Sequence, residues 1–151
     1  MKSPQEVITR AGMFTDKWLG AYERPNRYSW AIVLKSTGEV IGRVFGMNPN
    51  DGLRQIELTY ELGRKWWRKG LMTEAVKAVI DFFFNNVGFS RIYANHADKN
   101  LASGKVMQKC GMKFEGTEKM ACKCNNGILD KCNYAIHATD AAVLQTQEIV
   151  K

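Results

Sequence analysis

The hydrophobic pattern changes its period twice between residues 55 and 95, and this change constrains the fold more than any other feature of the sequence. Apolar and polar residues alternate over Gln55–Leu62, as they do on a half-buried strand. Over Leu71–Val87 the apolar residues recur with the period of an amphipathic helix. After a break at Gly88, Arg91–Asn95 is typical of a second strand. A strand, a helix and a strand in this order predict a crossover whose two strands run parallel.

Turn residues predict two antiparallel strand pairs. The first pair, over 28–35 and 39–47, is joined by the short glycine-containing connection Ser36-Thr37-Gly38 and is followed by the connection 48–52. The second pair, over 112–123 and 128–138, surrounds an Asn-Gly turn at 125–127.

Capping residues predict two further helices. One runs over Ser3–Gly20 and begins with a serine cap and a proline, and the other runs over Leu101–Cys110 and ends at Gly111. Together with the strands they predict an α/β (α+β) fold, with a mixed, mostly antiparallel central sheet and helices on both faces.

The chain of 151 residues is long enough for one domain, which we expect over 1–138, with a C-terminal tail over 139–151. Its composition, 45% hydrophobic and 25% charged, excludes a disordered or fibrous chain. No apolar run approaches the ~20 residues of a membrane span, and the first residues lack the apolar core of a signal peptide. We therefore expect a cytoplasmic protein without a membrane partner.

A formal net charge of +7 favours anionic partners such as phosphates, nucleotides or nucleic acid. A basic module that binds RNA or the ribosome surface, without catalytic activity, is the alternative to an enzyme. The lysines and arginines are dispersed, and the aromatic residues do not repeat at a base-stacking spacing, so this alternative ranks second.

Four cysteines lie late in the chain, at 110, 122, 124 and 132, and a reducing cytosol would keep them as thiols. A zinc site could be assembled from Cys122, Cys124, Cys132 and His137, but its first two ligands are separated by one residue instead of two to four. Alternate residues share one face of a strand, so a hairpin explains the pair more simply, and we expect no metal.

The segment between the first strand of the crossover, Gln55–Leu62, and its helix, Trp66–Ala75, is a candidate phosphate site. A helix start there leaves peptide N–H groups without intrahelical acceptors, and Gly70 allows close approach of a ligand. Arg68 and Lys69 add positive charge. A basic helix start with a single glycine is also common in proteins without such a site, so the segment alone does not decide the function.

Five segments carry a resemblance to one protein family. They are Glu57–Leu62, Trp67–Ala75, Asn100–Ser103, Cys110–Gly116 and Gly127–Asp130. In this order they resemble the fourth strand, pyrophosphate loop, second motif, Gly-Phe stretch and last hairpin of the GNAT superfamily of N-acetyltransferases, in the RimJ/RimL-like branch that acetylates N-termini of ribosomal proteins. Arg68 stands where that branch usually has glycine. The resemblance covers roughly Ser3 to Ala138, in family order and at family spacing, and the family's first strand and helix are expected to be missing. Either the sequence is shortened there, or the open edge and the acceptor cleft are completed by a second copy of the chain, as a homodimer, or left exposed.

The resemblance implies a GNAT-like acyl-CoA N-acyltransferase fold and an N-acetyltransferase activity. The acetyl group of acetyl-CoA would pass to a primary amine by direct attack in a ternary complex, without a metal. A protein N-terminus, such as that of a ribosomal protein, is one candidate acceptor, and polyamines, amino acids and aminoglycosides are others.

The resemblance also implies which residues bind acetyl-CoA. The backbone of the strand would pair with the pantetheine arm, the loop would hold the pyrophosphate, and Asn100 would contact the pantetheine. Lys105 is either a phosphate contact or an ordinary solvated helix lysine. In this sequence the strand residues are Tyr60, Glu61 and Leu62, and the loop residues are Arg68, Lys69, Gly70, Leu71, Met72 and Thr73.

For catalysis, Ser103 occupies the place of a hydroxyl near the thioester and would stabilise or protonate the leaving thiolate. A base must take the amine proton, and Glu57 and Glu61 lie on one strand face. We prefer Glu57, because the branch often has an acid there; a surface carboxylate paired with a cation is the alternative. His96 and His137 are expected at ordinary strand-end or hairpin positions.

Two aromatic clusters are interpreted as packing residues. Trp66 and Trp67 could line an acceptor cleft, but aromatic residues of this size more often pack against a sheet edge. Phe82, Phe83 and Phe84 are interpreted as part of the core.

Overall fold

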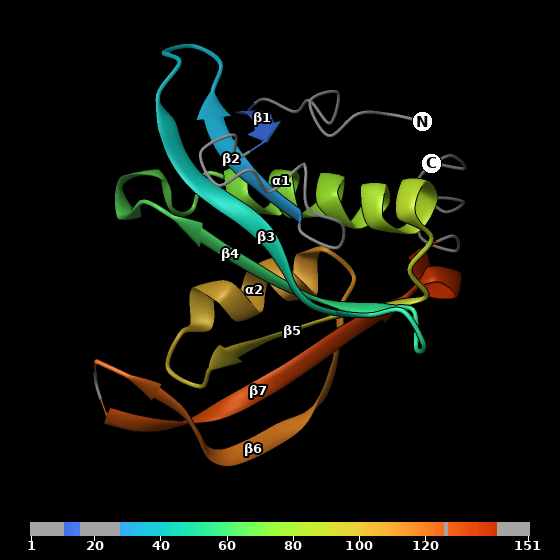
Figure 1. The fold of residues 1–151 in the computed structure, drawn as a ribbon. Helices are drawn as coiled ribbons and strands as arrows, with labels where there is room; N and C mark the ends of the chain where they lie inside the picture. Colours follow the sequence, from blue (N-terminus) through green and yellow to red (C-terminus); the bar gives the residue numbers. More distant parts are fainter. Residues whose placement is uncertain (1–10, 16–27, 126, 142–151) are drawn as a thin grey trace.

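A computed structural model describes residues 11–15, 28–125 and 127–141. Its centre is a seven-stranded sheet in the order β1-β2-β3-β4-β5-β7-β6 (Figure 1). Among the described residues, no helix has the length and hydrophobicity that crossing a membrane requires. The elements are β1 (Ala11–Thr15), β2 (Tyr28–Leu34), β3 (Val40–Asn50), β4 (Gln55–Leu62), the 3-10 helix η3 (Arg64–Trp66), α1 (Leu71–Phe82), the π-helix η4 (Phe83–Val87), β5 (Arg91–Ala97), α2 (Leu101–Lys109), β6 (Lys113–Cys124) and β7 (Gly127–His137).

The predicted crossover is confirmed. β4 leads through α1 and η4 into β5, and β4 and β5 pair in parallel, whereas the other neighbouring strands of this sheet pair antiparallel. Gly88 ends the helical segment with a left-handed φ of 90°, and Gly111 follows α2 with a φ of 87°. The predicted mixed, mostly antiparallel sheet is therefore present.

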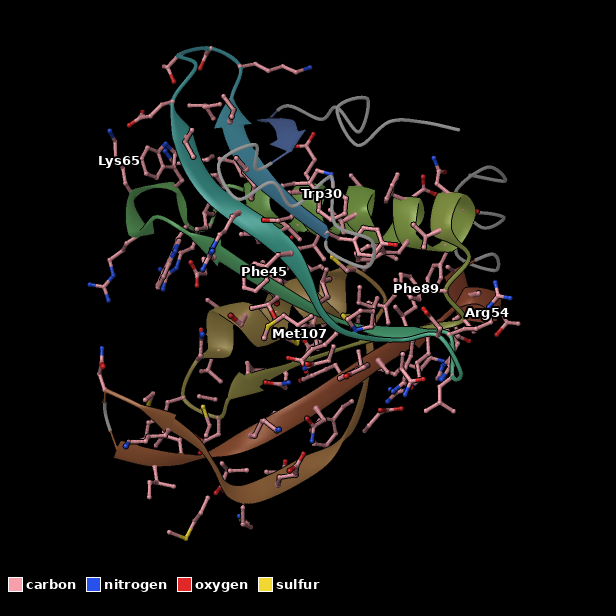
Figure 2. All side chains as sticks on the ribbon, in the orientation of Figure 1. Trp30, Phe45, Arg54, Lys65, Phe89 and Met107 are labelled. Atoms are coloured by element: carbon pink, nitrogen blue, oxygen red, sulfur yellow. The ribbon has the colours of Figure 1, made fainter. Side chains whose placement is uncertain are left out.

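The core forms where α1 packs on the sheet. The apolar face of α1 meets the inward side chains of β2, β3 and β4, and an aromatic cluster surrounds Phe83, which packs edge-on against Trp30 and Phe89. Figure 2 shows Trp30 and Phe89 on this side of the sheet, and Met107 of α2 is buried in the same core. Because α1 and α2 also contact each other, they share one face of the sheet. The assignment of Phe82 and Phe83 to the core is confirmed.

The helix predicted over Ser3–Gly20 is wrong where the structure describes it. Residues 11–15 form β1, which pairs antiparallel with β2, and the rest of the predicted helix lies outside the described residues. Without β1, the peptide groups on that edge of β2 would lack a partner strand. Pairing with a distant strand overrides the local helical pattern here.

The connection predicted over 48–52 is shorter than expected. β3 continues to Asn50, with Asn48 at a φ of 50° and a shift of register between Met47 and Asn50 that accommodates one extra residue on β3.

At the other end of the chain, the hairpin of β6 and β7 is confirmed and includes Cys122 and Cys124 on β6. Residues 138–141 are helical, and residues 142–151 of the predicted tail lie outside the described residues.

Candidate functional site

β4 and β5 separate part of the way along the sheet. They pair only from Gln55 to Glu57 on β4 and from Arg91 to Tyr93 on β5, although β4 continues to Leu62 and β5 to Ala97. Figure 1 shows the two strands diverging beyond this point, with α2 beside the opening. The parallel ladder thus ends in the middle of the sheet and leaves two strand edges that face a gap.

The strand register shows which peptide groups face this gap. The Gly63 N–H donates to the Ile41 carbonyl at 2.9 Å, and in an antiparallel pair alternate residues bond to the partner strand. Glu61 therefore directs its peptide groups toward β3, whereas Tyr60 and Leu62 direct theirs toward the gap. The Leu62 carbonyl accepts a hydrogen bond from the Trp67 indole N–H at 2.8 Å. The Tyr60 peptide N–H and carbonyl have no partner within the described part of the chain.

The loop after β4 presents a second set of unpaired donors. Arg68 and Gly70 have left-handed φ values of 63° and 75°, and α1 begins with Gly70 as a cap that makes no side-chain hydrogen bond. The first backbone bond of α1 runs from the Glu74 N–H to the Gly70 carbonyl at 3.1 Å. The peptide N–H groups of residues 68–73 consequently find no acceptor among the residues described. Such an array, at the positive end of a helix dipole, is suited to binding a phosphate.

Some side chains of this loop anchor it in the core, and others give its surface a positive charge. Leu71 and Met72 are buried in the core, so the first turn of α1 is anchored, while Arg68 and Lys69 are exposed. Lys65 lies over the Trp66 ring, with its Nζ atom 5.2 Å from the ring centre. Trp66 itself packs against the core, in agreement with the interpretation as a packing residue. The loop combines unpaired donors with an excess of cations.

The first turn of α2 lies close to β4. The Asn100 side chain caps α2, its Oδ1 atom accepting from the Ser103 N–H at 3.4 Å. The Tyr60 hydroxyl donates to the Ser103 carbonyl at 2.7 Å. The Ser103 hydroxyl has no hydrogen-bond partner within the ranges that the structure covers, and Lys105 is exposed. The structure therefore brings Tyr60, Asn100 and Ser103 together, as predicted for one site, and adds the Tyr60 side chain, which the sequence did not indicate.

A second bond joins the end of α2 to the start of α1. The Cys110 thiol lies 3.6 Å from the Thr73 carbonyl and donates to it. Burial raises the pKa of Cys110 to about 12. Burial also raises the pKa of Tyr60 well above its ordinary value, with a further contribution from Cys110. Both groups therefore stay protonated and act as donors at neutral pH.

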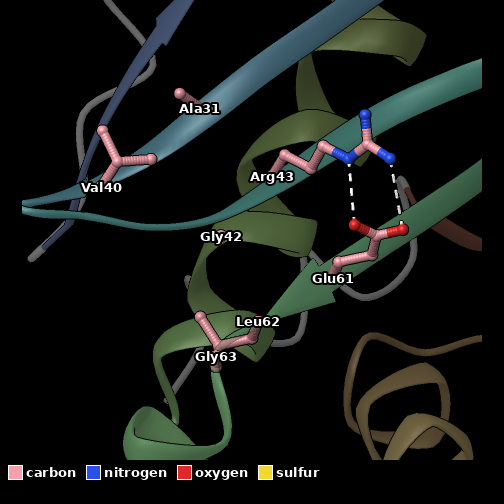
Figure 3. A pocket seen from close by; sticks show the side chains of 7 residues that line it. All are labelled: Ala31, Val40, Gly42, Arg43, Glu61, Leu62 and Gly63. Carbon is pink, nitrogen blue, oxygen red and sulfur yellow. Dashed lines mark hydrogen bonds and ion pairs between the residues drawn. The ribbon is translucent and has the colours of Figure 1, made fainter.

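The two candidate bases lie on the opposite face of the sheet from the Tyr60 ring, because β4 residues alternate in direction. Glu61 is held by Arg43 through two bonds of 3.1 and 3.3 Å (Figure 3), and the guanidinium lies 4.6 Å from the centre of the Phe45 ring. Glu57 is half-buried beside Tyr93, whose pKa is raised by burial and by the charge of Glu57. An ion pair thus engages Glu61, whereas Glu57 makes no ion pair with the other residues that the structure describes.

A cavity of about 530 Å³ lies on this face next to the Arg43–Glu61 pair (Figure 3). Ala31, Val40, Gly42, Leu62 and Gly63 complete its lining.

Both histidines occupy the kind of position that was expected. His96 is buried on β5, with its Nδ1 atom 2.6 Å from the Ala97 carbonyl. His137 is the last residue of β7 and lies 3.4 Å from Asp140.

Known proteins are similar to this chain in sequence and in fold. The acetyltransferase (GNAT) domain family matches residues 2–113. An uncharacterised N-acetyltransferase of Bacillus licheniformis is 35% identical over 106 residues, 70% of this chain and 58% of that protein. A ribosomal-protein-alanine N-acetyltransferase of Escherichia coli is 39% identical over 62 residues, 41% of this chain and 32% of that protein. A solved ribosomal-protein-alanine acetyltransferase of Vibrio fischeri superposes with a TM-score of 0.76 at 24% identity, covering 82% of this chain and 68% of that one.

The chain belongs to the GNAT acetyltransferase family, and the predicted resemblance to its RimJ/RimL-like branch is confirmed. It spans 58% of the length of the Bacillus licheniformis relative.

The left-handed conformation of Arg68 leads to a prediction about stability. Arg68→Gly is expected to be about 1 kcal/mol more stable than Arg68→Ala, because both changes remove the same cation and only glycine adopts this φ without steric cost. Urea unfolding of the two variants measures the difference. Equal stabilities would show that the loop does not hold this conformation in solution.

Proposed function

We propose that this chain transfers the acetyl group of acetyl-CoA to a primary amine. The observation that carries the proposal is that two surfaces with unpaired peptide groups lie next to each other. The open edge of β4 runs directly into the loop whose N–H groups are unpaired at residues 68–73. Acetyl-CoA carries amides in its pantetheine arm and a pyrophosphate beyond them, so one extended molecule satisfies both surfaces.

The residues assigned to acetyl-CoA follow from this arrangement. The Tyr60 peptide group pairs with a pantetheine amide, as an added strand would. The N–H groups of residues 68–73 hold the pyrophosphate, and the charges of Arg68 and Lys69 support them. Asn100, at the start of α2, contacts the pantetheine, and Lys105 lies on the same helix as a further cation for a phosphate.

In the reaction, the amine nitrogen forms a bond to the acetyl carbonyl carbon and the carbon–sulfur bond breaks. Glu57 takes the proton that the amine loses, and the Ser103 hydroxyl donates a hydrogen bond to the departing thiolate. Glu57 is preferred to Glu61 because Arg43 holds the Glu61 carboxylate in a two-bond pair. The proton finally passes from the base through solvent to the thiolate, which leaves as the thiol of CoA.

The acceptor that we propose is a protein N-terminus, with that of a ribosomal protein as the first to test. Support comes from the ribosomal-protein-alanine acetyltransferases that the chain resembles. Basic residues near the loop give the chain an attraction to the ribosome surface as well.

Charge at residue 70 tests the pyrophosphate assignment. Asparagine and aspartate have nearly the same shape and both tolerate a left-handed φ, so Gly70→Asn is the matched control for Gly70→Asp. We expect the aspartate variant to bind CoA on the order of tenfold more weakly than the asparagine variant, because its charge opposes a phosphate at the helix start. Titration calorimetry measures both affinities, and equal values would rule out an anion at this loop.

The rate of thiol release tests both the activity and the base. Release of thiol from acetyl-CoA is followed with N-terminal peptides of ribosomal proteins and with polyamines as acceptors. With Glu57 as base, we expect Glu57→Gln to lower kcat on the order of a hundredfold, because an amide cannot take the proton that the amine loses. Glu61→Gln is the control and should keep the kcat of the unmodified chain.

Two results would count against these assignments. If neither class of amine stimulates thiol release, the proposed activity is wrong. A kcat that Glu57→Gln leaves unchanged and Glu61→Gln lowers would transfer the role of base to Glu61.

A further inference from the structure

The Tyr60 side chain links β4 to α2 beyond the point where β4 and β5 stop pairing. The ladder ends at Glu57 and Tyr93, so no strand pairing sets the distance between the rest of β4 and the segment after β5. Three residues further on, the Tyr60 hydroxyl reaches the Ser103 carbonyl at 2.7 Å, and the Tyr60 ring packs against the core. This bond joins the two sides of the gap at the first turn of α2.

Both backbone polar groups of Ser103 are hydrogen-bonded to side chains. Its N–H is bound by the Asn100 side chain and its carbonyl by the Tyr60 hydroxyl. Its own hydroxyl has no partner in the described stretch, so the backbone of this turn decides where that hydroxyl lies.

We propose that Tyr60 is a positioning residue that sets the place of the Ser103 hydroxyl for acetyl transfer. This role rests on the proposed function. There the peptide group of Tyr60 pairs with a pantetheine amide, and the present role concerns its side chain. The opposite end of α2 is tied independently, by the Cys110 thiol to the Thr73 carbonyl. Loss of the Tyr60 bond therefore releases the first turn while the last turn stays attached to α1.

The chemistry of the Tyr60 hydroxyl fits positioning better than proton transfer. Its pKa is raised by burial and by the neighbouring Cys110 and Tyr134, so the group remains a hydrogen-bond donor across the pH range of enzyme assays. A hydroxyl so reluctant to ionise is a poor proton donor to a thiolate. Its contribution is geometric, and its removal should leave the shape of the pH–rate profile unchanged.

Tyr60→Phe keeps the packed ring and removes only the donor. We expect kcat to fall about tenfold, since a small displacement of a reacting group is costly, while KM for acetyl-CoA changes less than twofold. Tyr134→Phe is the matched control. Its hydroxyl also touches α2, accepting from the Gln108 amide at 3.4 Å at the far end of the helix, and its loss should leave both constants unchanged.

A double-mutant cycle separates positioning from general weakening of the fold. If Tyr60 acts through Ser103, adding Tyr60→Phe to Ser103→Ala causes no further loss of kcat. The inference is overturned if Tyr60→Phe alone keeps the unmodified kcat, if it raises KM instead of lowering kcat, or if its full effect persists in Ser103→Ala. A rate that is unchanged in Ser103→Ala also overturns it. Lack of amine-dependent thiol release by the unmodified chain would instead remove the proposed function, and this role with it.

Discussion

The parallel pairing of β4 and β5 stops after Glu57 and Tyr93, and the candidate site depends on that interruption. A strand edge inside a sheet normally has its peptide groups paired, because unpaired polar groups away from water are costly. Here the peptide group of Tyr60 lies on such an edge without a strand opposite it. The gap is thus a place where an extended molecule with amide groups can replace the missing strand.

The crossover connection explains why the proposed phosphate site lies beside this gap. A helix that follows a strand directly begins near the end of that strand, and α1 starts at Leu71, soon after β4 ends at Leu62. Its first turn therefore presents its unpaired N–H groups at the end of the open edge. The left-handed backbone at Arg68 and Gly70 turns the loop into a concave array of donors. Topology, rather than any single side chain, places the open edge of β4 and the unpaired N–H groups of the loop next to each other.

The sequence predicted the central part of this arrangement well, because its signals there are local. The alternation over Gln55–Leu62 gave the observed bounds of β4, and glycines at 88 and 111 ended the helical segments where a left-handed residue is needed. The helix start with unpaired N–H groups after Gly70 was likewise indicated by local residue types. Strong periodicity and special backbone conformations are features that a sequence records directly.

Features that depend on distant residues were missed. β1 was predicted as a helix because its pairing with β2 is a tertiary contact. The bond between Tyr60 and Ser103 joins residues 43 positions apart, and the pairing of Arg43 with Glu61 joins residues 18 positions apart. Both depend on strand register and helix placement. These bonds distinguish Glu57 from Glu61 and place Ser103, so the finer assignments within the site required the structure.

Amide hydrogen exchange with and without CoA tests the central claim most directly, because it reports on the peptide groups themselves. The account predicts that CoA slows exchange at Tyr60 and at residues 68–73, while exchange in the β6–β7 hairpin stays the same. Unchanged exchange at those positions under saturating CoA would contradict it.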